Sequence, residues 1–344
     1  MQKQNLLRAH AELYRRTADE QFDSLTALSD HCRQQRVASQ DRWRPPADLR
    51  VETAAEGLML AAGGDGAFLM NDWSFGQLCR LASVGKETVN RLSAETARRV
   101  FVETLPAGNK PLQLFTQDDR LRSIHGASYT RLFDADLVAL LQEFAVDFQP
   151  PQTAAGGGTG LYAGEQDMFC FLIDPAGWTE IEGEAFAPGF FLWNSEVGKR
   201  SLGIQTFWFQ AVCQNHIVWD AVDVVDYSRK HTASVHESLG EVRRIIEALV
   251  AQRDARRDGF AKVIAKAMQT RLGDDADEVA DAVAKCGISR AAIKQALKIA
   301  ERQGRFTIFA LVDALTRLSA ESKFAGERTE ADQRAARLLD LVAA

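Results

Sequence analysis

Long apolar runs are missing from this chain. No stretch approaches the roughly 20 apolar residues that a membrane-spanning helix requires, and the opening MQKQNLLRAHAELYRR lacks the apolar core of a secretory signal. Cysteine is scarce as well, because the five cysteines lie far apart, whereas a disulfide framework or a cysteine zinc site needs closer spacing. We therefore expect a soluble, cytoplasmic protein with free thiols and no membrane segment.

Positive charge is absent from one long segment. Between Leu132 and Gly198 there is no lysine or arginine. The same segment, the acidic span 132–198, holds eleven carboxylates: Asp134, Asp136, Glu143, Asp147, Glu165, Asp167, Asp174, Glu180, Glu182, Glu184 and Glu196. Since the whole chain has a net charge of −6, the sequence outside this span is net positive, and a polyanion is expected to bind there.

Common catalytic motifs are also absent. The sequence has no serine-nucleophile elbow and no lysine-containing phosphate-binding loop. The glycine run at 156–160 does not fit a dinucleotide-binding turn, because a PPQ linker precedes it and a predicted strand follows it. We interpret 151–160 as a Gly-rich, mobile surface loop. A binding protein is therefore favoured over an enzyme, and we expect no cofactor.

The pattern of apolar residues predicts an α+β fold, an antiparallel β-meander sheet with packed helices. An amphipathic helix is expected over 2–31, and Pro45 and Pro46 make 41–50 a connector, which bounds a first unit at 1–44. Two helices over 73–105, a hairpin over 111–126 and a helix over 133–146 precede short aromatic strands between 167 and 225. These elements predict a core domain over 45–228.

An all-helical C-terminal domain is expected over 229–344, where apolar residues recur at three- and four-residue spacing in six segments. Within it, 279–303 has the order of a helix-turn-helix unit: Gly287 lies at the turn, Ser289 caps the second helix, and Val283 and Ile293 supply packing. The second helix is basic, which suits DNA phosphates, although purely structural helical hairpins share this pattern.

Basic residues on the C-terminal side of the acidic span are the candidate nucleic-acid contacts. They are Lys199, Arg200, Arg229, Lys230, Arg243, Arg244, Arg290, Lys294, Lys298, Arg302 and Arg305. If these side chains gather on one face, they form a continuous phosphate-binding surface; if they are spread among acids, they are solvated helix faces. Trp193, Trp208, Phe209 and Trp219 are expected to stack on bases if they are exposed.

Two metal sites were considered and neither is predicted. The acidic span could supply oxygen ligands for Mg²⁺, but it has no compact carboxylate motif, and Glu180, Glu182 and Glu184 alternate as on one solvated strand face. Cys213, His216, His231 and His236 have acceptable ligand types, yet free cysteine on an apolar strand is usually a core residue. We therefore predict no metal site.

A resemblance rests on FFLWNSEVGKRSLGIQTFWFQAVCQNHIVWD, on the following Arg229-Lys230-His231 step and on TIFALVDALTR near the end. These segments resemble the phage/plasmid-like family, whose members carry a domain of unknown function. The matching positions are Asn194, Ser195, Glu196, Val197, Gly198, Arg200, Ser201, Cys213, Asn215 and His231. The resemblance covers about residues 60–340. It implies a setting in mobile elements and DNA metabolism but assigns no catalytic residue.

Three functional hypotheses follow. The first is a non-catalytic nucleic-acid-binding protein, with DNA favoured, that acts in single-strand binding or annealing as a homo-oligomer; similarity in outline to single-strand annealing proteins is an analogy of fold. The second is a metal-dependent nuclease or hydrolase that uses the acidic span 132–198. The third is a regulatory or scaffolding protein that binds another protein.

Overall fold

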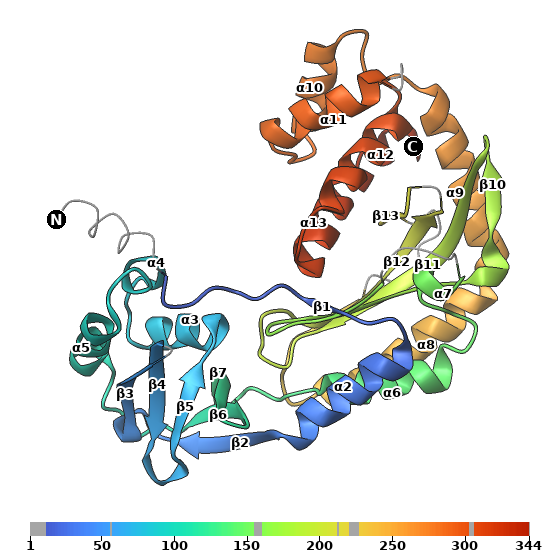
Figure 1. Ribbon diagram of the computed structural model, residues 1–344. Coiled ribbons are helices and arrows are strands. Elements are labelled where there is room, and N and C mark those ends of the chain that lie inside the picture. Colours follow the sequence, from blue (N-terminus) through green and yellow to red (C-terminus); the bar gives the residue numbers. More distant parts are fainter. Residues whose placement is uncertain are drawn as a thin grey trace.

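The computed structural model describes residues 12–55, 57–154, 160–211, 213–219, 227–302 and 306–343 (Figure 1). Its backbone forms one antiparallel sheet, a second mixed sheet and surrounding helices, and from Ser238 to Ala343 its regular elements are helices. The α+β prediction with an all-helical C-terminal region is thus confirmed.

The N-terminal segment differs from the expected helix. Residues 12–19 are extended and lead into strand β1 (Glu20–Gln21), so the helix prediction is wrong over 12–24 and lies outside the described residues over 2–11. Helix α2 (Leu25–Val37) begins after Ser24, whose hydroxyl accepts a hydrogen bond from the main-chain N–H of Ala27. Buried Asp19 instead accepts from the main-chain N–H of Ala325, 2.9 Å away, so a long-range contact overrides local periodicity.

The mixed sheet lies at the left of Figure 1 and includes a segment that was expected to be a connector. Its strands are β2 (Ser39–Arg44), β3 (Leu49–Ala54), β4 (Gly57–Ala62), β5 (Ala67–Met70), β6 (Leu112–Gln117) and β7 (Arg120–Gly126). Their order is β2-β6-β7-β5-β4-β3, with β5 and β7 parallel. The connector prediction over 41–50 is wrong at both ends, because Pro45 and Pro46 interrupt the chain between two strands rather than exclude strands.

Three helices pack on this sheet where two were predicted: α3 (Asp72–Leu81), α4 (Lys86–Val89) and α5 (Ala94–Thr104). Leu58 and Leu60 on β4 face Phe75, Leu78 and Phe101 in one apolar core. Burial of several large apolar side chains, each worth about 1.5–3 kcal/mol, holds these helices on the sheet. The predicted hairpin over 111–126 is confirmed as β6 and β7.

The antiparallel sheet is the expected meander. Its other strands are β8 (Leu161–Ala163), β9 (Met168–Ile173), β10 (Thr179–Ile181), β11 (Glu184–Asn194), β12 (Leu202–Gln210), β13 (Asn215–Ile217) and β14 (Tyr227–Arg229). The order is β1-β8-β9-β11-β12-β13, while β10 pairs with β11 and β14 pairs with β12. Because side chains alternate across each strand, the two faces of this sheet bury different residues.

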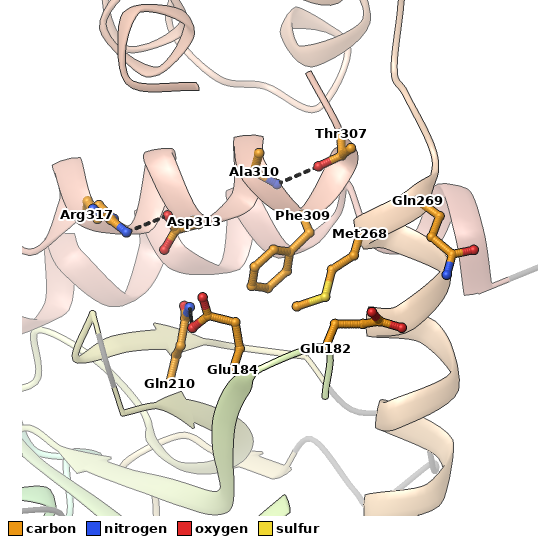
Figure 2. Close-up of a pocket in the computed structure, with 10 residues that line it drawn as sticks. All are labelled: Glu182, Glu184, Gln210, Met268, Gln269, Thr307, Phe309, Ala310, Asp313 and Arg317. Atoms are coloured by element: carbon orange, nitrogen blue, oxygen red, sulfur yellow. Dashed lines mark hydrogen bonds and ion pairs between the residues drawn. The ribbon is translucent and has the colours of Figure 1, made fainter. Parts of the chain in front are cut away.

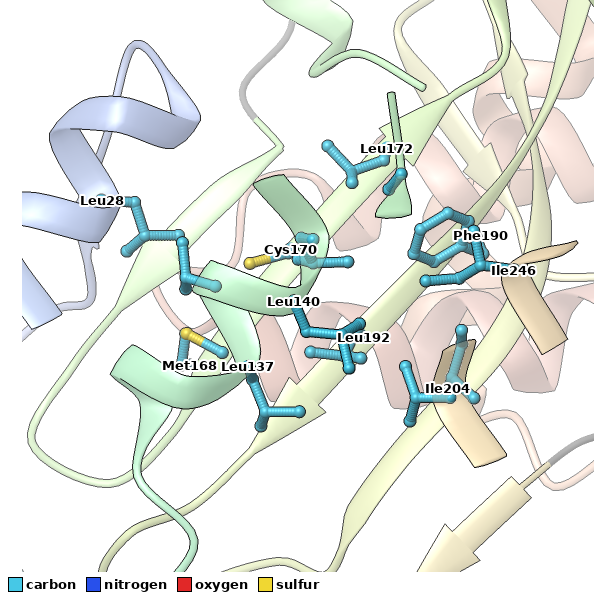
Figure 3. Close-up of a cluster of buried hydrophobic side chains, with 14 of the residues drawn as sticks. Leu28, Leu137, Leu140, Met168, Cys170, Leu172, Phe190, Leu192, Ile204 and Ile246 are labelled. Atoms are coloured by element: carbon cyan, nitrogen blue, oxygen red, sulfur yellow. The ribbon is translucent and has the colours of Figure 1, made fainter. Parts of the chain in front are cut away.

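One face of the sheet packs against α2, α6 (Asp134–Phe144) and α8 (Ser238–Ala251). Figure 3 shows Leu28, Leu137, Cys170, Phe190 and Ile246 within this core. The opposite face is aromatic, with Phe169 and Phe171 on β9, Phe191 on β11, and Phe207 and Phe209 on β12. Helix α13 (Ala325–Ala336) lies over this aromatic face.

The six predicted C-terminal helices are confirmed. Besides α8 and α13 they are α9 (Arg253–Gln269), α10 (Ala276–Ala284), α11 (Arg290–Arg302) and α12 (Ile308–Ser319). A further turn, α14 (Asp340–Ala343), follows. Of the Gly-rich segment, 151–154 forms the helical turn α7 (Pro151–Ala154), and 155–159 lies outside the described residues. Across the described ranges, none of the helices combines the length and the apolar character that crossing a membrane demands.

Candidate functional site

The loop between β11 and β12, residues 195–201, lies where the two sheets meet, and we call it the junction loop. Its main-chain carbonyls accept hydrogen bonds from side chains next to the mixed sheet. The Trp73 indole N–H donates to the carbonyl of Val197 over 2.8 Å, and the Tyr129 hydroxyl donates to that of Glu196 over 3.0 Å. Arg131 also donates to the Glu196 carbonyl. Hydrogen bonds from side chains outside the loop therefore hold its main chain in place.

A buried pair of carboxyl groups lies beneath the loop. The side-chain amide of Asn194 donates to Asp134 Oδ1 over 2.8 Å, and the Asp134 main-chain N–H donates to Glu196 Oε1 over 2.9 Å. Removal from water raises the pKa of Asp134 well above its ordinary value, and the nearby charge of Glu196 raises it further. Burial therefore favours the protonated, neutral form of the Asp134 carboxyl group.

Two histidines stack around the same loop. The ring of His125 lies parallel to that of Tyr129, with centroids 3.7 Å apart. The ring of His231 also stacks on that of Tyr129, with centroids 5.4 Å apart. Burial lowers the pKa of His125 to about 3 and that of His231 to about 4, so both are neutral at pH 7. Gly198, at φ +70°, approaches His125 so closely that a Cβ would lie 2.7 Å from its ring.

The residues that carry the resemblance thus fall into two places. Asn194, Ser195, Glu196, Gly198 and His231 lie together at the junction of the sheets, largely buried. Cys213 and Asn215 lie elsewhere, against α12. Asn215 donates to Asp313 Oδ1 over 2.9 Å, and Arg317 Nη2 lies 2.7 Å from the Cys213 sulfur.

An aromatic-floored cavity of about 320 Å³ opens beside the junction loop, between the sheet and α13. We call it the tryptophan cavity. Its lining residues are Phe169, Phe191, Trp193, Arg200, Ser201, Thr329, Glu330 and Gln333. The rings of Phe191 and Trp193 stack at 5.1 Å, and the Trp193 ring lies so close over Gly203 that a Cβ there would overlap it. Phe169 and Phe191 are almost fully buried and Trp193 is half-buried, so Trp193 is the aromatic side chain of this lining that offers surface to the cavity.

Polar groups surround this floor. The Arg200 guanidinium lies 2.8 Å from Glu330 Oε1 and 3.3 Å from Asp167 Oδ2, so its charge is balanced within the protein. The amide of Gln333 donates to the amide oxygen of Gln205 over 2.5 Å. Amide groups, a hydroxyl on Ser201 and the ion pair give the cavity both donors and acceptors at its edge.

Four predicted basic residues come together at this end of the sheet. Arg229 on β14 is the cross-strand partner of Leu202, which places 229–230 beside 199–201. Arg229 lies 3.5 Å from Glu237. Lys199 and Lys230 are exposed and form no ion pair with any residue in the described ranges. They are the two cations here that remain available to an anion.

The other predicted basic residues lie away from the tryptophan cavity. Arg243 and Arg244 are on α8, which covers the opposite face of the sheet (Figure 1). Arg243 pairs with Glu247 at 2.8 Å and Arg244 with Glu241 at 2.6 Å. The arginines of α8 are therefore interleaved with acids, and they do not extend the surface around Lys199 and Lys230.

Helix α11 carries a separate basic row. Arg290, Lys294 and Lys298 are exposed, follow at four-residue spacing and have no ion pair within the described part of the chain. The unit predicted over 279–303 contains two helices, α10 and α11, joined by a turn with Gly287 at φ +78°, and the Ser289 hydroxyl accepts from the Ala292 main-chain N–H; residue 303 lies outside the described residues. Asp277 and Asp281 on α10 line the same groove. The Arg302 side chain and Arg305 lie outside the described part.

Apart from the Asp134–Glu196 pair, two buried carboxylates of the acidic span are paired with arginines. Asp174 pairs with Arg253, and Asp167 pairs with Arg200. Glu180, Glu182 and Glu184 do not share a strand face, because Glu182 at φ +51° and Gly183 form the turn between β10 and β11. Among residues with described positions, no group of three or more His, Cys, Asp or Glu is placed to hold a metal ion.

Of the four aromatic residues singled out in the sequence, only Trp193 lines the tryptophan cavity. Trp208 and Phe209 are fully buried, and the Trp219 indole donates to Asp340 over 3.1 Å. The sequence analysis missed Phe169, Gln205, Glu330 and Gln333. The alternating aromatics at 169/171, 191/193 and 207/209 could have predicted the aromatic face, whereas the residues of α13 had no local signal.

Searches against protein-family models, curated proteins and solved structures find no match for this chain.

Proposed function

We propose that this protein binds single-stranded nucleic acid, with DNA favoured, at the tryptophan cavity and the adjacent lysines. The observation that carries the proposal is the half-buried Trp193 in this cavity, near two exposed cations, Lys199 and Lys230, that form no ion pair with any residue in the described ranges. Proteins that bind single strands combine aromatic side chains, on which bases stack, with cations that follow the phosphates. A base of a single strand is free to stack on an aromatic side chain, whereas the bases of a duplex are already stacked on one another.

The distribution of charge favours separate places for the base and for the phosphates. Because Arg200 is balanced by Asp167 and Glu330, the cavity itself favours a neutral base rather than a phosphate. Lys199 and Lys230 are exposed and lie outside the cavity lining, where they can pair with phosphates of a bound strand; Lys199 Nζ also lies 5.4 Å from the centroid of the Trp73 ring. Gln333 lines the cavity and, while its amide N–H donates to Gln205, can offer its amide oxygen to a base edge, since glutamine amides are suited to contact adenine.

The groups of the junction loop support binding rather than catalysis. His125 and His231 are neutral and largely inside the protein, burial favours the neutral form of Asp134, and none of these three residues lines the tryptophan cavity. Their contacts keep Lys199 and Ser201 in place; for example, the Ser195 hydroxyl accepts from the Lys199 main-chain N–H over 2.8 Å. We therefore assign the junction loop a positioning role.

The experiment is a fluorescence-anisotropy titration of labelled single-stranded and duplex DNA at two salt concentrations. Single strands are expected to bind more tightly, with affinity that falls as salt rises. Trp193→Leu is expected to weaken single-strand binding by about tenfold, since stacking is worth about 1–3 kcal/mol per base. Trp43→Leu is the control, because Trp43 is 45% exposed on β2 and lies outside the cavity. Salt-independent binding, or equal effects of the two variants, would reject the proposal.

The wider setting stays a prediction from the sequence. It comprises phage or plasmid DNA metabolism, a cytoplasmic location and homo-oligomer formation.

A further inference from the structure

An extended N-terminal segment, residues 12–19, runs from the mixed sheet to the start of α13 (Figure 1). We call it the strap. At the mixed sheet, the Tyr14 hydroxyl donates to the Leu58 carbonyl over 2.8 Å and accepts from the Leu58 N–H over 2.7 Å. The Tyr14 N–H also donates to the Asn90 side chain over 2.9 Å. One end of the strap is therefore fixed to the part of the protein that contains the mixed sheet.

Helix α13, which supplies part of the lining of the tryptophan cavity, has no N-cap from its own sequence. Phe324 precedes it, and an aromatic side chain cannot accept a hydrogen bond from the first helical N–H groups. The neighbouring helix α12 does have such a cap, because the Thr307 hydroxyl accepts from the Ala310 N–H over 3.2 Å (Figure 2). The start of α13 therefore needs an acceptor from elsewhere in the chain.

Asp19 of the strap provides this acceptor. Its Oδ2 accepts from the Ala325 N–H over 2.9 Å, although the two residues are 306 positions apart in the sequence. The Asp19 N–H donates in return to the Lys323 carbonyl over 3.4 Å. The Asp19 side chain is 1% exposed, and Gly164 lies so close to its Oδ1 that a Cβ there would overlap it. A buried carboxylate thus caps α13, and its negative charge suits the positive end of the helix dipole.

Ion pairs connect the strap to the cavity lining as well. Arg16 Nη2 lies 3.1 Å from Asp19 Oδ1 and 3.7 Å from Asp167 Oδ2. The same Oδ2 of Asp167 lies 3.3 Å from Arg200 Nε, and Arg200 lies 2.8 Å from Glu330 on α13. Both Arg200 and Glu330 line the tryptophan cavity. The strap, Arg200 and α13 therefore form one connected network of charges beside the cavity.

We propose that Asp19 is a positioning residue for single-strand binding at the tryptophan cavity, an inference that rests on the proposed function. Asp19 does not line the cavity and acts through α13, which carries the lining residues Thr329, Glu330 and Gln333. A binding site needs supporting contacts that keep its groups within about 0.5 Å of the productive geometry. The C-terminal end of α13 packs in a second core with α9 and α12, so loss of Asp19 shifts the start of the helix and leaves the fold intact.

The test is a double-mutant cycle on the full chain, with the fluorescence anisotropy of labelled single-stranded oligo-dA as the readout. Asp19→Ala is expected to weaken binding about fivefold or more and to leave the salt slope unchanged, because it removes a helix cap and no phosphate contact. In the Trp193→Leu background the same change should weaken binding less than about twofold, since both residues act on one cavity.

Two further variants separate the cap from a general loss of stability. Asp19→Asn keeps an oxygen for the Ala325 N–H and should restore most of the affinity that Asp19→Ala loses. Tyr14→Phe frees the strap at its other end without a change next to α13. It should give a smaller loss that also depends on Trp193, and it takes the place of Asp19→Ala if urea denaturation shows that Asp19→Ala is unfolded.

Asp275→Ala is the matched control. It removes the same charge and the N-cap of α10, where Asp275 accepts from the N–H groups of Asp277 and Glu278 over 2.9 Å each. Helix α10 does not line the tryptophan cavity, so the effect of Asp275→Ala should be equal with and without Trp193→Leu.

Failure of the positioning role and failure of the proposed function give different results. The positioning role is overturned if Asp19→Ala binds like the parent, if its effect adds fully to that of Trp193→Leu, or if Asp19→Asn binds as weakly as Asp19→Ala. If the parent does not prefer single strands, or if Trp193→Leu changes nothing, the proposed function itself fails and this inference fails with it.

Discussion

The side-chain amide of Asn194 donates one hydrogen bond to Asp134 Oδ1 over 2.8 Å and another to the main-chain carbonyl of Leu132 over 2.9 Å. Asn194 ends β11 and Asp134 begins α6, so this amide ties the central sheet to the helix that covers it. Asn194 is fully buried, and both bonds form without water.

Asn194→Asp is therefore expected to destabilise the protein strongly. It places a third carboxyl group beside Asp134 and Glu196 in a buried site, at a cost of about 3–5 kcal/mol. Chemical denaturation at pH 7 measures the loss, and part of the stability should return at pH 5, where the new group can be protonated. Asn109→Asp, in an exposed loop, is the control; an equally large effect there would contradict the explanation.

Replacing Lys199 and Lys230 together by alanine is expected to weaken binding to single strands at low salt. Each lysine that contacts a phosphate contributes about 0.7 to the slope of log affinity against log salt, so the slope should fall by about one unit or more. Arg243→Ala with Arg244→Ala removes the same charge from ion-paired residues on α8. If that control lowers the slope as much, the lysines have no special role.

The basic row of α11 gives a separate prediction. Arg290→Ala, Lys294→Ala and Lys298→Ala together should weaken binding to all sequences and lower the salt slope by about two units or more. The effect of Trp193→Leu should persist in this background, because α11 does not line the tryptophan cavity. Arg33, Arg98 and Arg257, each beside a nearby acid, provide the triple-alanine control. An unchanged slope would show that α11 is a structural hairpin only.

Gly203→Ala tests the position of the Trp193 ring. A Cβ at Gly203 would overlap that ring, and the half-buried tryptophan must move off the sheet. Overpacking of this kind costs about 1–3 kcal/mol of stability. The affinity for single strands should also fall, because the Trp193 ring would leave its position in the cavity. Denaturation and anisotropy measure the two effects. Gly108→Ala meets nothing within 4 Å and should change neither.

Asp332 makes stability depend on pH. Burial raises its pKa from 3.8 to about 7, against the opposing effects of Arg328 and of the Ser319 hydroxyl. Between about pH 4 and 7 the folded state holds a proton that the unfolded state releases, so stability from this group is full at low pH and falls as pH rises. The fall is at most about 1.4 kcal/mol per pH unit for one proton.

Asp332→Asn is expected to match the parent protein near pH 4 and to exceed it in stability near pH 8, measured by urea denaturation. Exposed Glu321→Gln should follow the parent at both values. If Asp332→Asn loses stability at pH 8, the carboxylate is ionised without cost and its raised pKa is refuted.

Local pattern was sufficient for much of this fold and misleading in two places. The β11–β12 pairing and the α10–α11 hairpin were predictable, because strand alternation, Gly287 and Ser289 act within a few residues. The segment 12–24 has helical spacing but is extended, since Asp19 and buried Phe22 are fixed by distant partners. Likewise β2 pairs with β6, about seventy residues away, which no local signal predicts.

The sequence by itself determined the α+β class, the meander, the C-terminal helices and the absence of positive charge from 132–198, because each depends on short-range periodicity or on composition. Only the tertiary structure decided which cations form ion pairs and which tryptophan lines a cavity. Those properties arise between residues far apart in the chain. Their energies depend on burial and distance, which composition does not contain.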